Sequence, residues 1–240
     1  MIVFTGVMMM NEPQQSVSDY TSTLNPAERQ AAVLNKTYTL LAASFLPCAA
    51  GAFVGMVFNP LAAIGNMWVA IGVMFAFFYG MCFAIEKNRY STTGAVLLMV
   101  FTFGMGVLLS GLLARAGMYR NGGELIATAA VMTAAVFFTM AALARRANIN
   151  TQALGKFLLT GGIVLMVGVV ANLFFQLPVL SLTIAGGFVV FSSLMIMWQI
   201  RSVIEGGEDS HISAALTIFI SIYNLFSSLL QLLLAFAGDD

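Results

Sequence analysis

The residues best placed for chemistry are five neutral polar side chains in one apolar segment near the C-terminus. Their spacing of 4, 3, 4 and 3 residues places them on one face of an α-helix; they are Thr217, Ser221, Asn224, Ser228 and Gln231. The opposite face of that helix carries only Ile and Leu. Hydroxyl and amide groups can hydrogen-bond to a neighbouring helix or line a path for a cation. We expect such a polar stripe to face the interior of a helix bundle or a water-filled cavity.

Three further polar side chains lie in the two preceding apolar segments. Asn172 and Gln176 are four residues apart and share a helix face, and Gln199 lies within one turn of the end of the next segment. Each could line a polar cavity together with the stripe, or satisfy backbone groups of a neighbouring helix. Both interpretations stay open. A hydrogen bond between helices in lipid contributes only about 0.6 kcal/mol, so packing alone does not account decisively for these side chains.

The loop of residues 205–211 contains an acidic cluster and the single histidine, His211. Its carboxylates could attract a cation at the mouth of the last two helices, or the loop could simply be solvated and cap those helices. One histidine without a second histidine or a neighbouring cysteine does not predict a zinc site. We expect neither a bound metal nor a cofactor.

The residues do not form a set typical of an enzyme. An intramembrane aspartyl protease needs two carboxylates within the bilayer, and every carboxylate lies outside the apolar segments. His211 also lies outside them, away from any serine that it could activate. Gly104 and Gly106 lie inside an apolar segment, without the strand that precedes a dinucleotide-binding loop. We expect no enzyme activity, and the balance of ten basic and ten acidic residues predicts no nucleic-acid partner.

The elements that carry these residues follow from the composition. Of 240 residues, 60% are hydrophobic and 8% are charged, against about 25% charged residues in a soluble protein. Seven segments are free of charge and long enough to cross a bilayer; they are residues 37–58, 66–85, 91–114, 125–144, 157–175, 179–200 and 212–236. We predict an all-α membrane protein, a bundle of seven transmembrane helices over residues 36–240, with membrane lipid as its solvent.

The basic residues indicate how the bundle is oriented. Two lie on one side, Arg115 and Arg120, and eight lie on the side of the N-terminus; these are Arg29, Lys36, Lys87, Arg89, Arg145, Arg146, Lys156 and Arg201. Short loops rich in Lys and Arg stay in the cytoplasm. The distribution places the N-terminus in the cytoplasm and, after seven crossings, the C-terminus on the far side.

The first 35 residues differ from the rest of the chain. Residues 14–25 are polar and lack a hydrophobic period, which predicts a flexible cytoplasmic tail over residues 1–35. Translation could start at any of four methionines, between which the sequence does not decide: Met1, Met8, Met9 and Met10.

Glycines predict two local features. Gly51 and Gly55 form a GxxxG pattern in the first apolar segment, which favours close packing of two helices within the monomer over packing between copies. Gly206 and Gly207 follow the sixth segment and can end its helix in a left-handed turn.

Motifs in the C-terminal third carry a resemblance to a known family. They are Ala171–Pro178 (ANLFFQLP), Ile204–Glu208 (IEGGE) and Ile218–Phe226 (IFISIYNLF), followed by Leu229-Leu230. With these motifs the chain resembles the Bax-inhibitor (transmembrane Bax-inhibitor-motif) family, and within it the bacterial YccA-like branch. The resemblance is strong over residues 157–240 and mostly topological before them.

The resemblance implies two functions. One branch of the family conducts calcium as a pH-sensitive leak, gated by two aspartates in helices six and seven. YccA-like proteins are instead substrates and modulators of FtsH, a membrane-anchored AAA+ protease that engages their N-terminal tail. The aspartate positions correspond here to Gln199 and Ser221, which do not ionise near neutral pH, whereas a carboxylate pair would supply a pH switch. The sequence therefore favours a YccA-like substrate or modulator of FtsH in the bacterial inner membrane. The alternative is a passive calcium leak, weak and insensitive to pH.

Overall fold

The computed structural model describes residues 25–58, 65–146 and 150–238, and all regular structure in these ranges is helical. The helices are α2 (Pro26–Phe58), α3 (Met67–Lys87), α4 (Thr92–Gly117), α5 (Gly122–Arg146), α6 (Thr151–Phe175), α7 (Pro178–Ile204) and α8 (His211–Ala237). All seven are long and apolar enough to cross a membrane. The predicted seven-helix transmembrane fold is confirmed.

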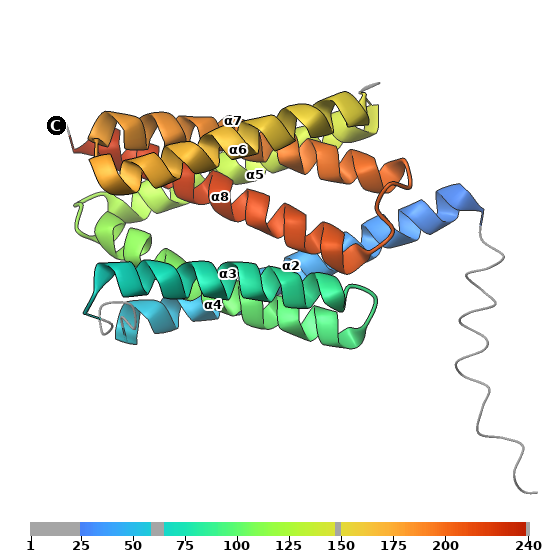
Figure 1. Ribbon diagram of the computed structural model, residues 1–240, viewed down its shortest axis with the longest axis horizontal. Coiled ribbons are helices and arrows are strands. Elements are labelled where there is room, and N and C mark those ends of the chain that lie inside the picture. Colours follow the sequence, from blue (N-terminus) through green and yellow to red (C-terminus); the bar gives the residue numbers. More distant parts are fainter. Residues whose placement is uncertain (1–24, 59–64, 147–149, 239–240) are drawn as a thin grey trace, which may run out of the picture.

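The helices run side by side in alternating directions (Figure 1). One group contains α2, α3 and α4, another contains α5, α6 and α7, and α8 crosses between them. The most extensive contacts of α8 are with α7, followed by α5 and α2. At one end of the bundle α2, α4, α6 and α8 begin and α3, α5 and α7 end. We call it the basic end, because the eight basic residues predicted to lie on the cytoplasmic side are in the helix ends and turns found there.

The first helix begins earlier than the apolar segment predicts, at Pro26 rather than at residue 37. Asn25 and Glu28 explain this start, because each side chain accepts a hydrogen bond from the other residue's backbone N–H, at 3.2 and 3.0 Å. This is a capping box, and Pro26 occupies the first helical position, where a missing N–H costs nothing. The tail predicted over residues 1–35 is therefore corrected, since residues 26–35 are helical. Residues 1–24, with the four possible start sites, lie outside the described residues.

The closest packing in the bundle is between α2 and α4, which share the most extensive helix–helix contact. A Cβ atom on Gly51 would collide with the carbonyl oxygen of Phe103, and one on Gly106 would collide with that of Cys48. A Cβ atom on Gly55 would also collide, though less severely, with the side chain of Ser110. The GxxxG pattern thus packs within the monomer, as predicted, and it lets the two backbones touch.

Candidate functional site

The polar stripe predicted near the C-terminus lies on α8, in the centre of the bundle. Ser221 and Ser228 are buried, and the other three members are half-buried. The opposite, apolar face of α8 is buried as well, at residues such as Ile218 and Leu225. The stripe lies in the interior because α8 contacts helices on both sides of the bundle, chiefly α7, α5 and α2.

The stripe makes few hydrogen bonds to other helices. The Ser221 hydroxyl donates to the carbonyl oxygen of Thr217 in its own helix, at 2.8 Å. Gln231 Nε2 donates to Ser181 Oγ of α7, at 2.8 Å, and is the one member of the stripe seen to hydrogen-bond a side chain of another helix in the described structure. Hydroxyls elsewhere in the interior follow the pattern of Ser221, for example Ser44 and Thr133, which donate to carbonyls four residues earlier. Such bonds satisfy a hydroxyl locally in a medium without water.

The two positions that correspond to the family's aspartates lie on neighbouring helices at different depths. Gln199 is only 3% exposed and lies five residues before the end of α7, whereas Ser221 lies ten residues after the start of α8. At 1.5 Å per residue, their depths differ by roughly 8 Å. No hydrogen bond joins them in the described part of the chain. Neither side chain can carry a charge near neutral pH.

Asn172 and Gln176 have a structural role in the turn between α6 and α7. Asn172 Oδ1 accepts a hydrogen bond from the Leu177 N–H, at 3.1 Å, and the Asn172 carbonyl accepts one from the Gln176 N–H, at 2.9 Å. Gln176 has a left-handed backbone with φ of 49°, and its side chain is exposed. The pair therefore ends α6 and aims the chain into α7, and the structure does not join it to the stripe.

A first ionic cluster lies at the basic end, where the α3–α4 turn meets the α7–α8 loop. Arg89 Nη2 lies 2.5 Å from Glu208 Oε1 and 3.3 Å from Asp209 Oδ1, and Nη1 lies 3.4 Å from Glu86 Oε2. The Tyr90 hydroxyl donates to Asp209 at 2.8 Å. The hydrogen bond from Tyr90, with help from Arg89, holds the pKa of Asp209 below its usual value.

The start of α8 is anchored to the same cluster. The Ser210 hydroxyl donates to the carbonyl of Arg89 at 2.7 Å and accepts the N–H of Ser213 at 3.2 Å, as the N-cap of α8. The Ser213 hydroxyl donates to Glu86 at 2.6 Å. Gly206, with φ of 77°, supplies the left-handed turn that the sequence predicts after α7.

A second ionic cluster holds the ends of α5, α6 and α7 together. Arg201 Nε lies 2.6 Å from Glu205 Oε1, and Arg201 Nη1 donates to the carbonyl of Ala144 at 3.3 Å. Thr151 donates to Glu205 Oε2 at 2.5 Å and accepts from Trp198 Nε1 at 3.1 Å. The hydrogen bonds from Thr151 and Arg201 keep the pKa of Glu205 below its usual value.

These two clusters account for the acidic loop. Glu205, Glu208 and Asp209 each lie at salt-bridge distance from an arginine of the same bundle. Among the described residues, no three His, Cys, Asp or Glu side chains gather as metal ligands would. The loop joins α7 to α8 through these ion pairs and the Ser210 cap. Sequence analysis missed the roles of Glu86 and Arg89, although their place in a short turn on the same side as the loop was a usable signal.

Comparison with known proteins places this architecture in a family. A family model described as "Inhibitor of apoptosis-promoting Bax1" matches residues 30–238. The chain belongs to the Bax-inhibitor family. The predicted membership is thereby confirmed over most of the chain, beyond the C-terminal third that carries the motifs.

Relatives in this family come from several bacteria. An uncharacterized protein of Neisseria meningitidis serogroup A is 57% identical over 229 residues, which cover 95% of this chain and all of the relative. The "Modulator of FtsH protease YccA" of Escherichia coli K12 is 34% identical over 234 residues, 96% of this chain and all of the relative. The protein named "Inner membrane protein YccA" in Escherichia coli O6:H1 matches to the same extent. With seven apolar helices, the chain is a multi-pass protein of the bacterial inner membrane.

Proposed function

We propose that this Bax-inhibitor family member is a YccA-like modulator of the FtsH protease. In this proposal, FtsH engages the segment that precedes α2. The observation that carries the proposal is the similarity to the Escherichia coli protein named a modulator of FtsH, which extends over that relative's full length. A modulator of this kind needs a part that the protease can reach and a membrane body that stays folded.

The start of α2 supports the first requirement. Its first turns extend beyond the other helices at the basic end (Figure 1), and residues 25–29 are exposed. The capping box of Asn25 and Glu28 fixes where the helix begins, and residues 1–24 of the sequence precede the box. When fully extended, 24 residues span at most about 86 Å. That reach suits a protease whose ATPase ring lies on the same side of the membrane.

The body of the bundle supports the second requirement. The ionic clusters of Arg89 and Arg201 connect the α3–α4 turn, the α7–α8 loop and the ends of α5 and α6. The α2–α4 contact fixes the first helix by backbone packing around Gly51 and Gly106. A body held in this way would resist extraction from the membrane, and would occupy the protease without being degraded quickly.

The competing function is passive calcium passage along α8. Its support is the stripe from Thr217 to Gln231, which lies inside the bundle over roughly 21 Å. The stripe contains no carboxylate, and Ser221 already donates its hydroxyl to its own helix. A leak along it would be weak and independent of pH, and it would leave the FtsH proposal untouched.

The test is co-purification with FtsH and turnover of the chain in reconstituted membranes. The full chain should co-purify with FtsH and slow the degradation of a second membrane substrate. A variant without residues 2–24 keeps the capping box, so it should fold as well as the full chain but lose both effects. A variant in which a Gly-Ser segment of equal length replaces residues 2–24 shows whether FtsH needs only the length of this segment or also its sequence. Failure to co-purify, with turnover unchanged by the deletion, would refute the proposal.

A further inference from the structure

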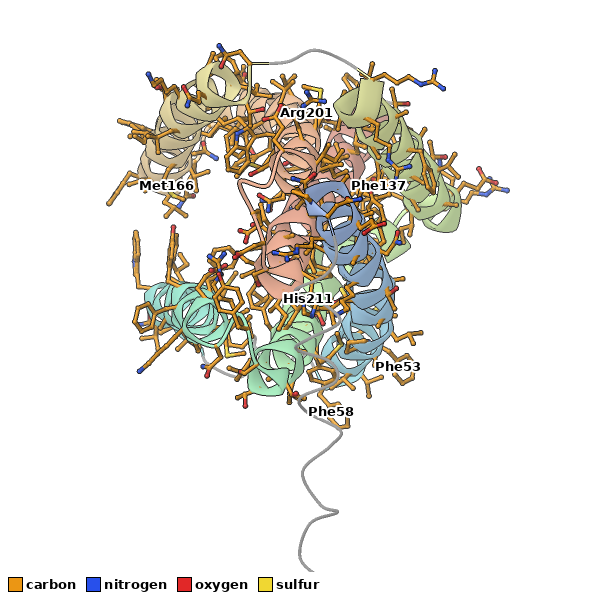
Figure 2. The ribbon with its side chains drawn as sticks, turned by 90° about the vertical axis from the view of Figure 1, so that its right-hand side faces the viewer. Phe53, Phe58, Phe137, Met166, Arg201 and His211 are labelled. Carbon is orange, nitrogen blue, oxygen red and sulfur yellow. The ribbon has the colours of Figure 1, made fainter. Side chains whose placement is uncertain are left out.

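A lateral groove lies between α2 and α5, and α8 forms the floor of its narrower part. It consists of two adjoining cavities of about 410 and 600 Å³, which share Leu41 and Phe45 of α2 and Phe137 and Phe138 of α5. The floor is apolar and comes from α8; its residues are Phe219, Ile222, Tyr223 and Phe226. Figure 2, which views the bundle from the basic end, shows Phe137 between α5 and α2. We call this feature the α2–α5 groove.

The dimensions of the α2–α5 groove suit an extended hydrocarbon chain. Its α5 wall runs from Ala130 to Arg146, a distance of roughly 24 Å along the helix. One leaflet accounts for about half of a hydrocarbon core roughly 30 Å thick. The groove is thus long enough for an acyl chain that enters from the headgroup level at the basic end.

The rim of the groove at the basic end is positively charged. Arg145 and Arg146 form the last turn of α5, line the wider cavity and are exposed. Within the described residues neither has a carboxylate at salt-bridge distance, in contrast to Arg89 and Arg201. The Arg145 guanidinium lies over the Tyr38 ring, 5.9 Å from its centroid. Two uncompensated cations therefore mark the place where the apolar groove meets the aqueous boundary.

Tyr38 supplies an independent sign of a missing ligand. It lines the same cavity, and its hydroxyl oxygen is buried without a hydrogen-bond partner in the described structure. Its ring packs edge-on against Phe137, with centroids 6.4 Å apart. A buried hydroxyl without a partner is costly, so a donor in this position calls for an acceptor. An anionic oxygen beside Arg145 and Arg146 would accept the hydrogen bond of the Tyr38 hydroxyl and neutralise charge on the two guanidinium groups.

We propose that the α2–α5 groove binds an anionic phospholipid. The phosphate lies against Arg145 and Arg146 and accepts a hydrogen bond from the Tyr38 hydroxyl, and one acyl chain follows the groove toward Ala130. Charge complementarity selects an anionic headgroup over a zwitterionic one. The apolar walls and the α8 floor retain the chain. This site is separate from the segment before α2 on which the FtsH proposal depends.

Native mass spectrometry of the full chain in detergent, titrated with phosphatidylglycerol or phosphatidylcholine of identical acyl chains, tests the headgroup. The protein should retain phosphatidylglycerol in preference. The double substitution Arg145→Gln with Arg146→Gln should weaken that binding about 25-fold, since each arginine near a membrane surface contributes about a factor of five. The matched control is Arg115→Gln with Arg120→Gln, which removes two exposed arginines at the opposite end and should leave binding unchanged. Equal retention of both lipids, or an equal loss in the control, would overturn the proposal.

Three single substitutions test the remaining contacts. Tyr38→Phe should weaken phosphatidylglycerol binding by about two- to tenfold, the effect of one lost hydrogen bond; no change would remove the hydroxyl from the site. Ala134→Trp fills the groove and should reduce binding, whereas Ala135→Trp, next to it on α5 but outside the lining, should not. Competition by glycerol phosphate as strong as by the lipid would show a site for a free phosphate and contradict the lipid assignment.

Discussion

The middle of the bundle and its basic end satisfy their polar side chains in opposite ways. In the middle, polar side chains are neutral and their hydroxyls donate to carbonyls of their own helices, as at Ser44 and Ser221. At the basic end, arginines contact carboxylates, and Arg89 contacts Glu208 across 119 residues of sequence. The cause is the solvent, because hydrocarbon penalises an uncompensated charge and the interface does not.

This difference indicates where the protein can act on other molecules. Groups that are satisfied within one helix hold the fold but offer little to a ligand. Groups at the basic end are either paired, as Arg201 is, or available, as Arg145 and Arg146 are among the described residues. Both proposals made above, the FtsH contact and the lipid site, use this end.

The largest expected effect comes from the packing in the middle. Gly106→Leu would drive a side chain into the backbone of α2 at Cys48, and we expect a loss of about 3 kcal/mol of stability or more, seen as poor expression and early thermal aggregation. Gly111→Leu, on the same helix with open space around its Cβ, is the matched control and should be tolerated. Equal tolerance of both substitutions would break the claim that the middle is held by backbone contact.

A smaller effect is expected from the ionic clusters. Arg89→Gln removes the partner of Glu208, whose side chain is only 14% exposed, and should cost about 1–2 kcal/mol of stability, as expected for charged hydrogen bonds. Arg115→Gln, at the opposite end, should change the melting temperature little. If both substitutions lowered the melting temperature equally, the Arg89 cluster would make no specific contribution to stability.

The pH profile of the melting temperature sharpens this prediction. The pKa values of Asp209 and Glu205 lie below their usual values because of their hydrogen bonds. Their contribution to stability is therefore complete above the unfolded-state pKa of about 4 and is lost as the pH falls through the lower folded-state pKa. The melting temperature should fall as the pH drops below about 4. A melting temperature that stays level below pH 4 would contradict this assignment.

The sequence predicts the transmembrane architecture well, because the exclusion of charge from lipid is a local property of each segment. It places the start of α2 too late, since an apolar segment reports only the part of a helix inside the bilayer. The Asn25-Pro26-Ala27-Glu28 pattern was the available signal for the true start.

The candidate site is less accessible to sequence analysis. Spacing predicts that Thr217 and Ser221 share a helix face, but it does not reveal that Ser221 bonds to Thr217 itself. The α2–α5 groove depends on residues about 100 positions apart, such as Tyr38 and Arg145, which only the packing around α8 brings together. For the long-range partners of Arg89, which are Glu208 and Asp209, the sequence indicates only that they lie at the same end of the bundle.

Calcium flux into proteoliposomes between pH 6 and 8 tests most directly whether the middle of the bundle lacks a carboxylate that could sense pH. The native protein should show flux close to that of empty vesicles, with no dependence on pH. The variant Gln199→Asp with Ser221→Asp, which restores carboxylates at the family's two positions, should show flux that varies with pH. A native flux well above the empty vesicles that changes severalfold over this range would contradict the account.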